Sequence, residues 1–296
     1  MVLFPERVNC WEPGTVQTWG PDDCSLYALA VGADFEDHSF VLSGDKVAKL
    51  KVYPTFLLAL VSADANSRVD PLLGIGEFDA STPVVLGEQR LVLHREVEAT
   101  GSVAISMGIT GLYDKGSGAV VVIEARGVDP DGGADAFTAT MTMFVVGAGN
   151  FGGERGPGRD RIEWPSREPD WTSTFVTPAT QSLLYMHAGN DDNAIHVDAA
   201  AARAAGFDGP ILTGQNSLGV ACRAIVHEVC EDRAEEIQSI TGGFGKPAYN
   251  GDTLTTEIWS DGSDDEEATR RLIFRVVNQD KAILIDGGRC QLAGPQ

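Results

Sequence analysis

The sequence predicts an α+β fold in which one unit, a long helix laid on a curved antiparallel sheet, occurs twice in the chain. Each half opens with a similar apolar segment and ends in three strand-like segments. A stretch rich in glycine, proline and charge lies between the two halves, as is typical of a surface linker. We therefore expect an N-terminal half over 1–150, a linker over 151–172 and a C-terminal half over 173–296.

The openings of the two halves are alike. Residues 25–32 (SLYALAVG) parallel residues 182–189 (SLLYMHAG) with one residue of slippage. Further along, the apolar segment 53–61 stands where residues 210–225 stand in the second half. We expect these later segments to form the long helix of each half, and the second of them to run over 214–228.

The ends of the two halves are alike as well, because each alternates β-rich segments with short turns. The segments of the first half are residues 102–113, 119–128 and 136–146, with turns at 114–118 and 129–133. Those of the second half are residues 253–260, 270–278 and 282–292, with turns at 261–267 and 279–281. This alternation predicts an antiparallel meander at the end of each half.

Composition and charge narrow the class of protein. A chain of 296 residues with 43% hydrophobic residues has enough apolar material for a substantial core. Its net charge of −21 argues against nucleic acid as a partner, because a phosphate backbone requires a basic face. No apolar run approaches the roughly 18 residues of a membrane span. The five cysteines are scattered and the start lacks a signal-peptide pattern, so we expect a cytoplasmic protein without a membrane partner.

The segment with the clearest chemistry carries an acid and a base. Asp191 and His196 lie five residues apart in an irregular stretch, and Gly214 then opens an apolar helical run. A carboxylate, an imidazole and a backbone donor at a helix start are the groups needed to move protons beside a polarised carbonyl. His187 would be a third metal ligand beside this pair, but no further ligand pattern accompanies it, so no metal is expected.

This segment resembles the signature of the MaoC-like (R)-specific enoyl-CoA hydratases, also called hydratase 2. The matching positions are Asp191, Asn193, His196, Asp198, Gly206, Phe207, Pro210, Ile211 and Gly214. The chain also resembles the two-domain type of these enzymes, which forms the hydratase part of multifunctional β-oxidation proteins. The further similar segments are residues 26–33, 53–56, 85–89, 114–118, 146–153 and 244–254. The resemblance implies a tandem double hot-dog fold and hydration of trans-2-enoyl-CoA to (3R)-hydroxyacyl-CoA, or the reverse dehydration.

Roles follow for individual residues of the second half. Asp191 and His196 are expected to hold one water and to supply both proton transfers, and the sequence leaves open which takes the first proton. The N–H of Gly214 is expected to face the thioester oxygen, and Asn193 to fix the loop. Lys246 is expected to neutralise a phosphate of coenzyme A, which arrives as part of the substrate, so no separate cofactor is implied.

The first half lacks the acid–base pair, so one catalytic centre per chain is expected. Its apolar segment, with Tyr53 and Phe56, is predicted to form a wall that binds long or bulky acyl groups. Residues 34–38 are interpreted as a solvated loop, and His227 as a surface or strand-edge residue. We expect a homodimer that acts in fatty acid or steroid side-chain metabolism.

The chain departs from the family pattern at three positions. It has Asn190 where the family has glycine, Thr213 where the family has histidine and Gly243 where the family has arginine.

Two other functions stay open on this fold. One is an acyl-CoA thioesterase, which directs water at the carbonyl carbon. The other is a non-catalytic acyl-binding partner subunit.

Overall fold

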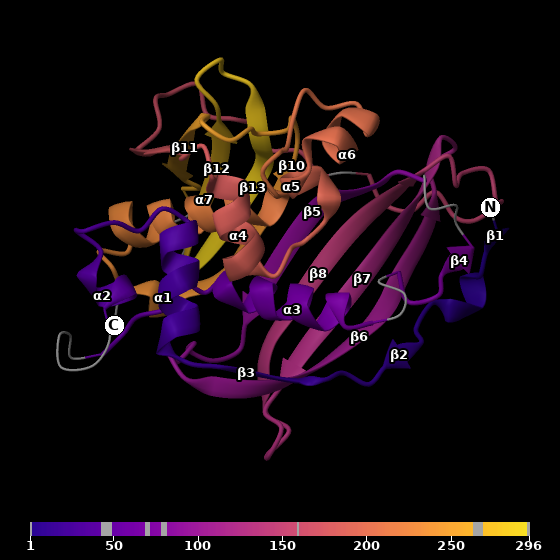
Figure 1. Ribbon diagram of the computed structural model, residues 1–296, viewed down its shortest axis with the longest axis horizontal. Helices are drawn as coiled ribbons and strands as arrows, with labels where there is room; N and C mark the ends of the chain where they lie inside the picture. The colour runs from indigo at the N-terminus through magenta and orange to yellow at the C-terminus, as the bar shows by residue number, and fades with distance from the viewer. Residues whose placement is uncertain are drawn as a thin grey trace.

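The computed structural model of the protein describes residues 2–42, 49–68, 72–77, 82–158, 160–262 and 269–294 (Figure 1). Most of the turn predicted at 261–267 lies outside these residues. Within the described ranges, no helix combines the length and apolarity needed to cross a membrane.

One eleven-stranded antiparallel sheet contains nearly all the strands of both halves. Its first-half strands are β2 (Trp11–Glu12), β3 (Val16–Trp19), β5 (Val84–Leu93), β6 (Gly101–Asp114), β7 (Gly118–Val128) and β8 (Asp135–Val146). Its second-half strands are β9 (Trp171–Val176), β10 (Ile237–Phe244), β11 (Thr253–Ser260), β12 (Thr269–Val277) and β13 (Ile283–Ala293). A separate two-stranded sheet joins β1 (Val2–Leu3) to β4 (Gly76–Glu77). The six strands predicted for the two meanders are confirmed to within a residue at each end.

The topology of the sheet shows the duplication. The two halves meet where β5 pairs antiparallel with β10, with Thr241 opposite Arg90. Outward from this pair the order is β5-β8-β7-β6-β3 on one side and β10-β13-β12-β11-β9 on the other. Each half therefore arranges its own strands in the same order, and β2 is an additional strand that pairs with β6.

The helices follow the same duplication. In the first half they are α1 (Pro21–Ala30), α2 (His38–Val41) and α3 (Phe56–Asn66), after the short 3-10 turn η1 (Pro5–Arg7). In the second half they are α4 (Gln181–Gly189), α5 (Ala194–Val197), α6 (Ala199–Ala204) and α7 (Gly214–Glu228), followed by the 3-10 turn η3 (Ala234–Glu236). Figure 1 shows α1, α3 and α4 on one face of the sheet. The predicted helix over 214–228 is confirmed as α7.

The two long helices are almost entirely buried. Every residue of α3 from Phe56 to Val61 is buried, and so is every residue of α7 from Gln215 to Cys222. A helix that is buried all round has neighbours on every side, and here α3 contacts β3 and β8 while α7 contacts β9, β10, β11 and β13. At Gly219 a Cβ atom would lie 2.5 Å from Val31 Cγ1, so glycine lets α7 approach the end of α1 closely.

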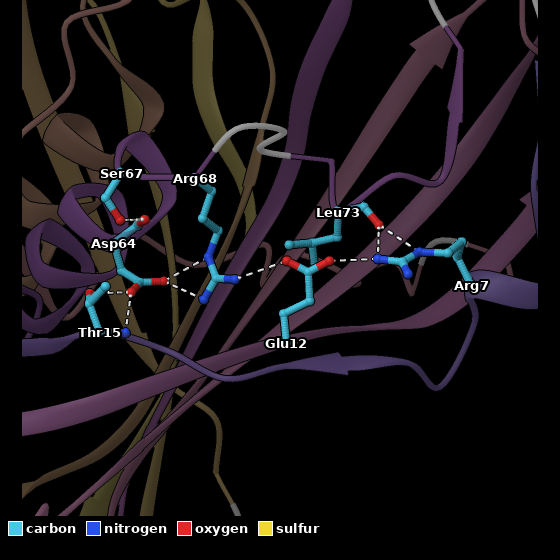
Figure 2. Close-up of polar contacts among 7 residues, drawn as sticks. All are labelled: Arg7, Glu12, Thr15, Asp64, Ser67, Arg68 and Leu73. Carbon is cyan, nitrogen blue, oxygen red and sulfur yellow. Dashed lines mark hydrogen bonds and ion pairs between the residues drawn. The ribbon is translucent and has the colours of Figure 1, made fainter.

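A polar network fastens the N-terminal segment to α3 (Figure 2). The side chain of Asp64, which is fully buried, accepts hydrogen bonds from the backbone N–H and the hydroxyl of Thr15 at 3.0 and 2.5 Å. Its other oxygen binds Arg68 at 2.6 Å. Arg68 also contacts Glu12, and Glu12 contacts Arg7. The network therefore joins the start of the chain to the last turns of α3.

A second network corrects two predictions, because residues 34–38 are not simply solvated and His227 is not at the surface or on a strand edge. His227 lies on α7, where its Nε2 atom is 2.7 Å from the hydroxyl of Tyr53 and 3.0 Å from Asp37 Oδ1. Its Nδ1 atom contacts Asp232. Asp37 is 6% exposed and also pairs with Arg223 at 2.8 Å. Burial by itself raises the pKa of Asp37, but the hydrogen bonds from His227 and Arg223 outweigh it and hold the pKa well below its usual value.

Candidate active site

The segment that carries Asp191 and His196 begins where α4 ends. Asn190 has a left-handed backbone, with φ 54°, and so stops the helix one residue before Asp191. Asparagine tolerates this conformation better than most residues other than glycine. We call residues 190–196 the acid–base segment.

The acid and the base face each other. His196 Nε2 lies 3.8 Å from Asp191 Oδ2, which is longer than a direct hydrogen bond. The other ring nitrogen of His196, Nδ1, lies 2.9 Å from the carbonyl oxygen of Ile211. Because a carbonyl only accepts, Nδ1 carries a proton, and in the neutral imidazole Nε2 presents its lone pair toward Asp191. His196 is 8% exposed, so this geometry is held inside the protein.

Hydrogen bonds between residues close in the sequence shape the acid–base segment. Asn193 is the N-cap of α5, and its side-chain oxygen accepts from the N–H of Ile195 at 3.3 Å. The N–H of Asn193 in turn donates to Asp191 Oδ1 at 3.3 Å. Asp198 caps α6, and the N–H groups of Ala201 and Ala200 lower its pKa. Asn193 and Asp198 are therefore the N-caps of α5 and α6.

Gly214 is the first residue of α7, so its N–H has no acceptor within the helix. Ile211 binds both His196 and, through its own N–H, the carbonyl of Ile195 at 3.3 Å, which brings the start of α7 beside the acid–base segment. A Cβ atom at position 214 would lie 2.8 Å from the ring of Phe244, so any larger residue there would have to displace that ring. Thr213, where the family pattern has histidine, caps α7 by accepting from the N–H of Asn216 at 2.9 Å.

Tyr185 is a residue of the site that the sequence analysis did not single out. It is fully buried on α4, and its ring centroid lies 6.1 Å from that of Tyr27. Burial raises its pKa well above the usual value, and the neighbouring phenol of Tyr27 and the carboxylate of Asp191 raise it further. Tyr185 is therefore a neutral phenol near Asp191. Its only signal in the sequence was its place in the repeated opening of each half.

Hydrogen bonds from polar side chains link the N-terminus of α7 to the first half. Asn216 donates to the carbonyl of Ala30 at 2.9 Å, and Gln181 donates to the same carbonyl at 2.6 Å. Ser62 of α3 donates to the side chain of Gln215 at 3.0 Å. The first half therefore positions the helix start that carries Gly214, although it supplies no counterpart of the acid–base pair.

The three residues predicted to bind substrate lie in different places. Lys246 is exposed and follows β10, two residues beyond Phe244, which contacts Gly214. Phe56 is 2% exposed and packs edge-on against Tyr27, with ring centroids 5.6 Å apart. Tyr53 is 1% exposed and binds His227 near the other end of α7, about 20 Å from Gly214 at 1.5 Å per helical residue. The structure therefore places Lys246 at the surface just beyond β10, buries Phe56 in the core and does not bring Tyr53 to the acid–base segment.

The titratable groups of the site show no arrangement for a metal. Among the described residues, no three histidine, cysteine, aspartate or glutamate side chains gather as metal ligands. The functional groups that the fold brings together are Asp191, His196 and the first N–H of α7.

Comparison with known proteins covers both halves. The family model described as the MFE-2 hydratase 2 N-terminal domain matches residues 18–147, and the MaoC like domain matches residues 163–281. A protein of Dictyostelium discoideum named probable enoyl-CoA hydratase 2 is 33% identical over 80% of each chain. The 3-hydroxyacyl-thioester dehydratase Y of Mycobacterium tuberculosis is 33% identical over 88% of each chain.

A solved structure shows the same fold. The MaoC-like dehydratase from Phytophthora capsici aligns with a TM-score of 0.85 at 24% identity, over 99% of this chain and 98% of that one. This likeness, together with the duplicated sheet, confirms the α+β tandem double hot-dog fold expected from the sequence.

Proposed function

The chain belongs to the MaoC-like hydratase 2 family of hydro-lyases, and from this premise we propose that its Asp191 and His196 catalyse (R)-specific hydration of trans-2-enoyl-CoA. The product is (3R)-hydroxyacyl-CoA, and the same site catalyses the reverse dehydration. The observation that carries the proposal is the 3.8 Å separation of His196 Nε2 and Asp191 Oδ2, with Nδ1 held on a carbonyl.

The geometry supports a definite order of proton transfers. A water oxygen between the two side chains donates one hydrogen bond to Asp191 and one to the lone pair on His196 Nε2. As the water oxygen forms its bond to Cβ, Nε2 takes a proton, and Asp191 stabilises the imidazolium that results. The electron pair of the double bond moves onto the thioester as an enolate, whose oxygen faces the N–H of Gly214 at the positive end of α7. The imidazolium then returns its proton to Cα, so that water has added across the double bond.

The experiment follows crotonyl-CoA by its enoyl absorbance while free thiol is measured in parallel. Loss of the enoyl signal without thiol release supports hydration, whereas thiol release identifies a thioesterase and assigns the water to the carbonyl carbon. If the enoyl absorbance does not fall and no thiol appears with enoyl-CoAs of several sizes, the chain is an acyl-binding subunit. The product is then offered to an (S)-specific 3-hydroxyacyl-CoA dehydrogenase, and complete oxidation would show that the (R) assignment is wrong.

We propose further that the enzyme prefers long or bulky acyl groups. The support is the apolar character of α3, whose residues 56–61 are all buried, together with the contact from Ser62 of α3 to Gln215 of α7. Each methylene buried there adds about 0.8 kcal/mol of binding, or roughly fourfold in affinity. We expect kcat/KM to rise from four-carbon to ten-carbon trans-2-enoyl-CoA. A kcat/KM that is highest at four carbons and falls with length would contradict this preference.

Lys246 is proposed to contact a phosphate of the coenzyme A moiety. Its exposed side chain lies just beyond the strand end that packs on Gly214, and an ammonium group serves as a point charge for phosphate. Lys246→Ala is expected to raise KM for the CoA ester several-fold and to leave kcat at saturation nearly unchanged. Lys281, another exposed lysine of the same half, provides the matched control as Lys281→Ala. An unchanged KM in Lys246→Ala would assign this side chain to the solvent.

The reaction is proposed to need no metal or redox cofactor, since coenzyme A arrives with the substrate and the proton transfers use side chains alone. The five cysteines are free thiols, which supports a location in the cytoplasm. We also propose that the protein is a homodimer and that it acts in fatty acid or steroid side-chain metabolism.

A further inference from the structure

We infer that Asn66, on the non-catalytic half, is a positioning residue for Asp191. The inference rests on the proposed hydratase function and extends it by assigning the first half a part in the chemistry. The contact that carries it runs from the side-chain amide of Asn66 to the carbonyl oxygen of Asn190 at 2.6 Å. That carbonyl belongs to the peptide unit whose nitrogen is that of Asp191.

A second hydrogen bond joins the same two segments. Asn190 donates from its own side-chain amide to the carbonyl of Ala59 at 3.3 Å. Both contacts therefore join one residue of the acid–base segment to α3. They fall on the residue with φ 54°, whose left-handed backbone sets the direction in which the chain leaves α4. Glycine would also adopt this φ, but it would have no side chain to reach Ala59.

The other end of the acid–base segment is held within the second half. His196 is fixed by its bond to the Ile211 carbonyl, and Asp198 caps the following helix. Asp191 lies between this anchor and the contact from α3. The distance between His196 Nε2 and Asp191 Oδ2 therefore depends on where α3 ends relative to the second half.

The end of α3 is itself a firm support. Asp64, two residues before Asn66, is fully buried and bound to Thr15 and Arg68 (Figure 2). Asn66 is the last residue of the helix and is exposed. Its replacement therefore leaves the buried contacts of α3 intact and removes only the bond to the acid–base segment.

The experiment measures kcat and KM for Asn66→Ala and for Asn66→Asp, which keeps the size of the side chain but not the amide donor. A misplacement of about 1 Å in a catalytic group lowers the rate by about 10²-fold, so we expect a partial loosening to lower kcat roughly tenfold. KM is expected to stay within about twofold, because Asn66 is proposed to act on Asp191 and not on the coenzyme A moiety of the substrate. Ser67→Ala is the matched control, since Ser67 follows α3 directly and its hydroxyl donates to the carbonyl oxygen of Asp64 at 2.6 Å, and it should keep wild-type kcat.

A second arm separates positioning from a general structural role. Asn66→Ala is combined with Asp191→Asn, and the double variant is expected to be no slower than Asp191→Asn alone, because Asn66 acts through that carboxylate. An equal loss in both backgrounds, an unchanged kcat in both Asn66 variants, or a raised KM with normal kcat would each overturn the inference. A wild-type protein that does not hydrate enoyl-CoA at all would instead overturn the proposed function.

Discussion

Asp191→Asn and His196→Ala are each expected to lower kcat for enoyl-CoA hydration by about 10²–10⁴-fold, the range for loss of one group that transfers or directs a proton. The asparagine keeps the size of Asp191 but lacks the negative charge that stabilises the imidazolium at 3.8 Å. Alanine at 196 removes both the proton acceptor and the link to the Ile211 carbonyl. Stopped-flow or steady-state measurement of enoyl absorbance gives kcat, and circular dichroism checks that each variant is folded.

The chain supplies matched controls for both changes. Asp192→Asn alters the exposed carboxylate next to Asp191, and His187→Ala removes an exposed imidazole from α4. Both controls are expected to stay within twofold of wild type. Because Asp191 and His196 act on one water, the double variant is expected to be little slower than the worse single variant. Activity within threefold of wild type for both Asp191→Asn and His196→Ala would remove the pair from the mechanism.

Asp64→Ala is expected to lower the free energy of unfolding by about 3–5 kcal/mol, because it leaves the largely buried Arg68 with only its 3.3 Å contact to Glu12. The side chain of Arg68 is 10% exposed and that of Asp64 is fully buried, so solvent screens the pair little. The two hydrogen bonds from Thr15 are lost as well, which releases the N-terminal segment from α3. Urea unfolding, with the midpoint and slope compared to wild type, measures the change.

Two further variants test the physical reason given for Asp64. The double variant Asp64→Ala/Arg68→Ala is expected to be less destabilised than the sum of its singles, since it removes the buried carboxylate and the guanidinium together. Lys49→Ala, which breaks two ion pairs whose side chains are 48–58% exposed, with Glu96 and Glu98, is expected to cost only about 0–1 kcal/mol. If Lys49→Ala and Asp64→Ala lower the free energy of unfolding equally, burial does not determine how much these ion pairs stabilise the protein.

Most of the fold could be predicted because its signals are local. The strands of both meanders alternate β-rich segments with turns, and α7 begins at the glycine that the sequence indicated. The similar openings predicted a duplication, and the strand order on each side of the β5–β10 pair shows it. That the halves share one continuous sheet was not predicted, because β5 lay outside the expected strands and its pairing with β10 leaves no local pattern.

The acid–base pair could be predicted for the same reason, since Asp191 and His196 are five residues apart and lie within one segment. Their separation, the tautomer of His196 and the placement of Gly214 beside them depend on the Ile211 carbonyl, which packing brings to the ring. The prediction for His227 was wrong because its partners Asp37 and Tyr53 come from the other half of the chain.

The sequence by itself determined the duplicated α+β fold, the family and the acid–base pair, because each is written in neighbouring residues or in a spacing that recurs. Only the tertiary structure shows which residues of the first half contact the acid–base segment and the N-terminal segment. Asn66 meets Asn190 across 124 positions, and Asp64 meets Thr15 across 49. Contacts of this kind form when packed helices and strands bring side chains within hydrogen-bond distance, and no periodicity or composition in the separate segments records them.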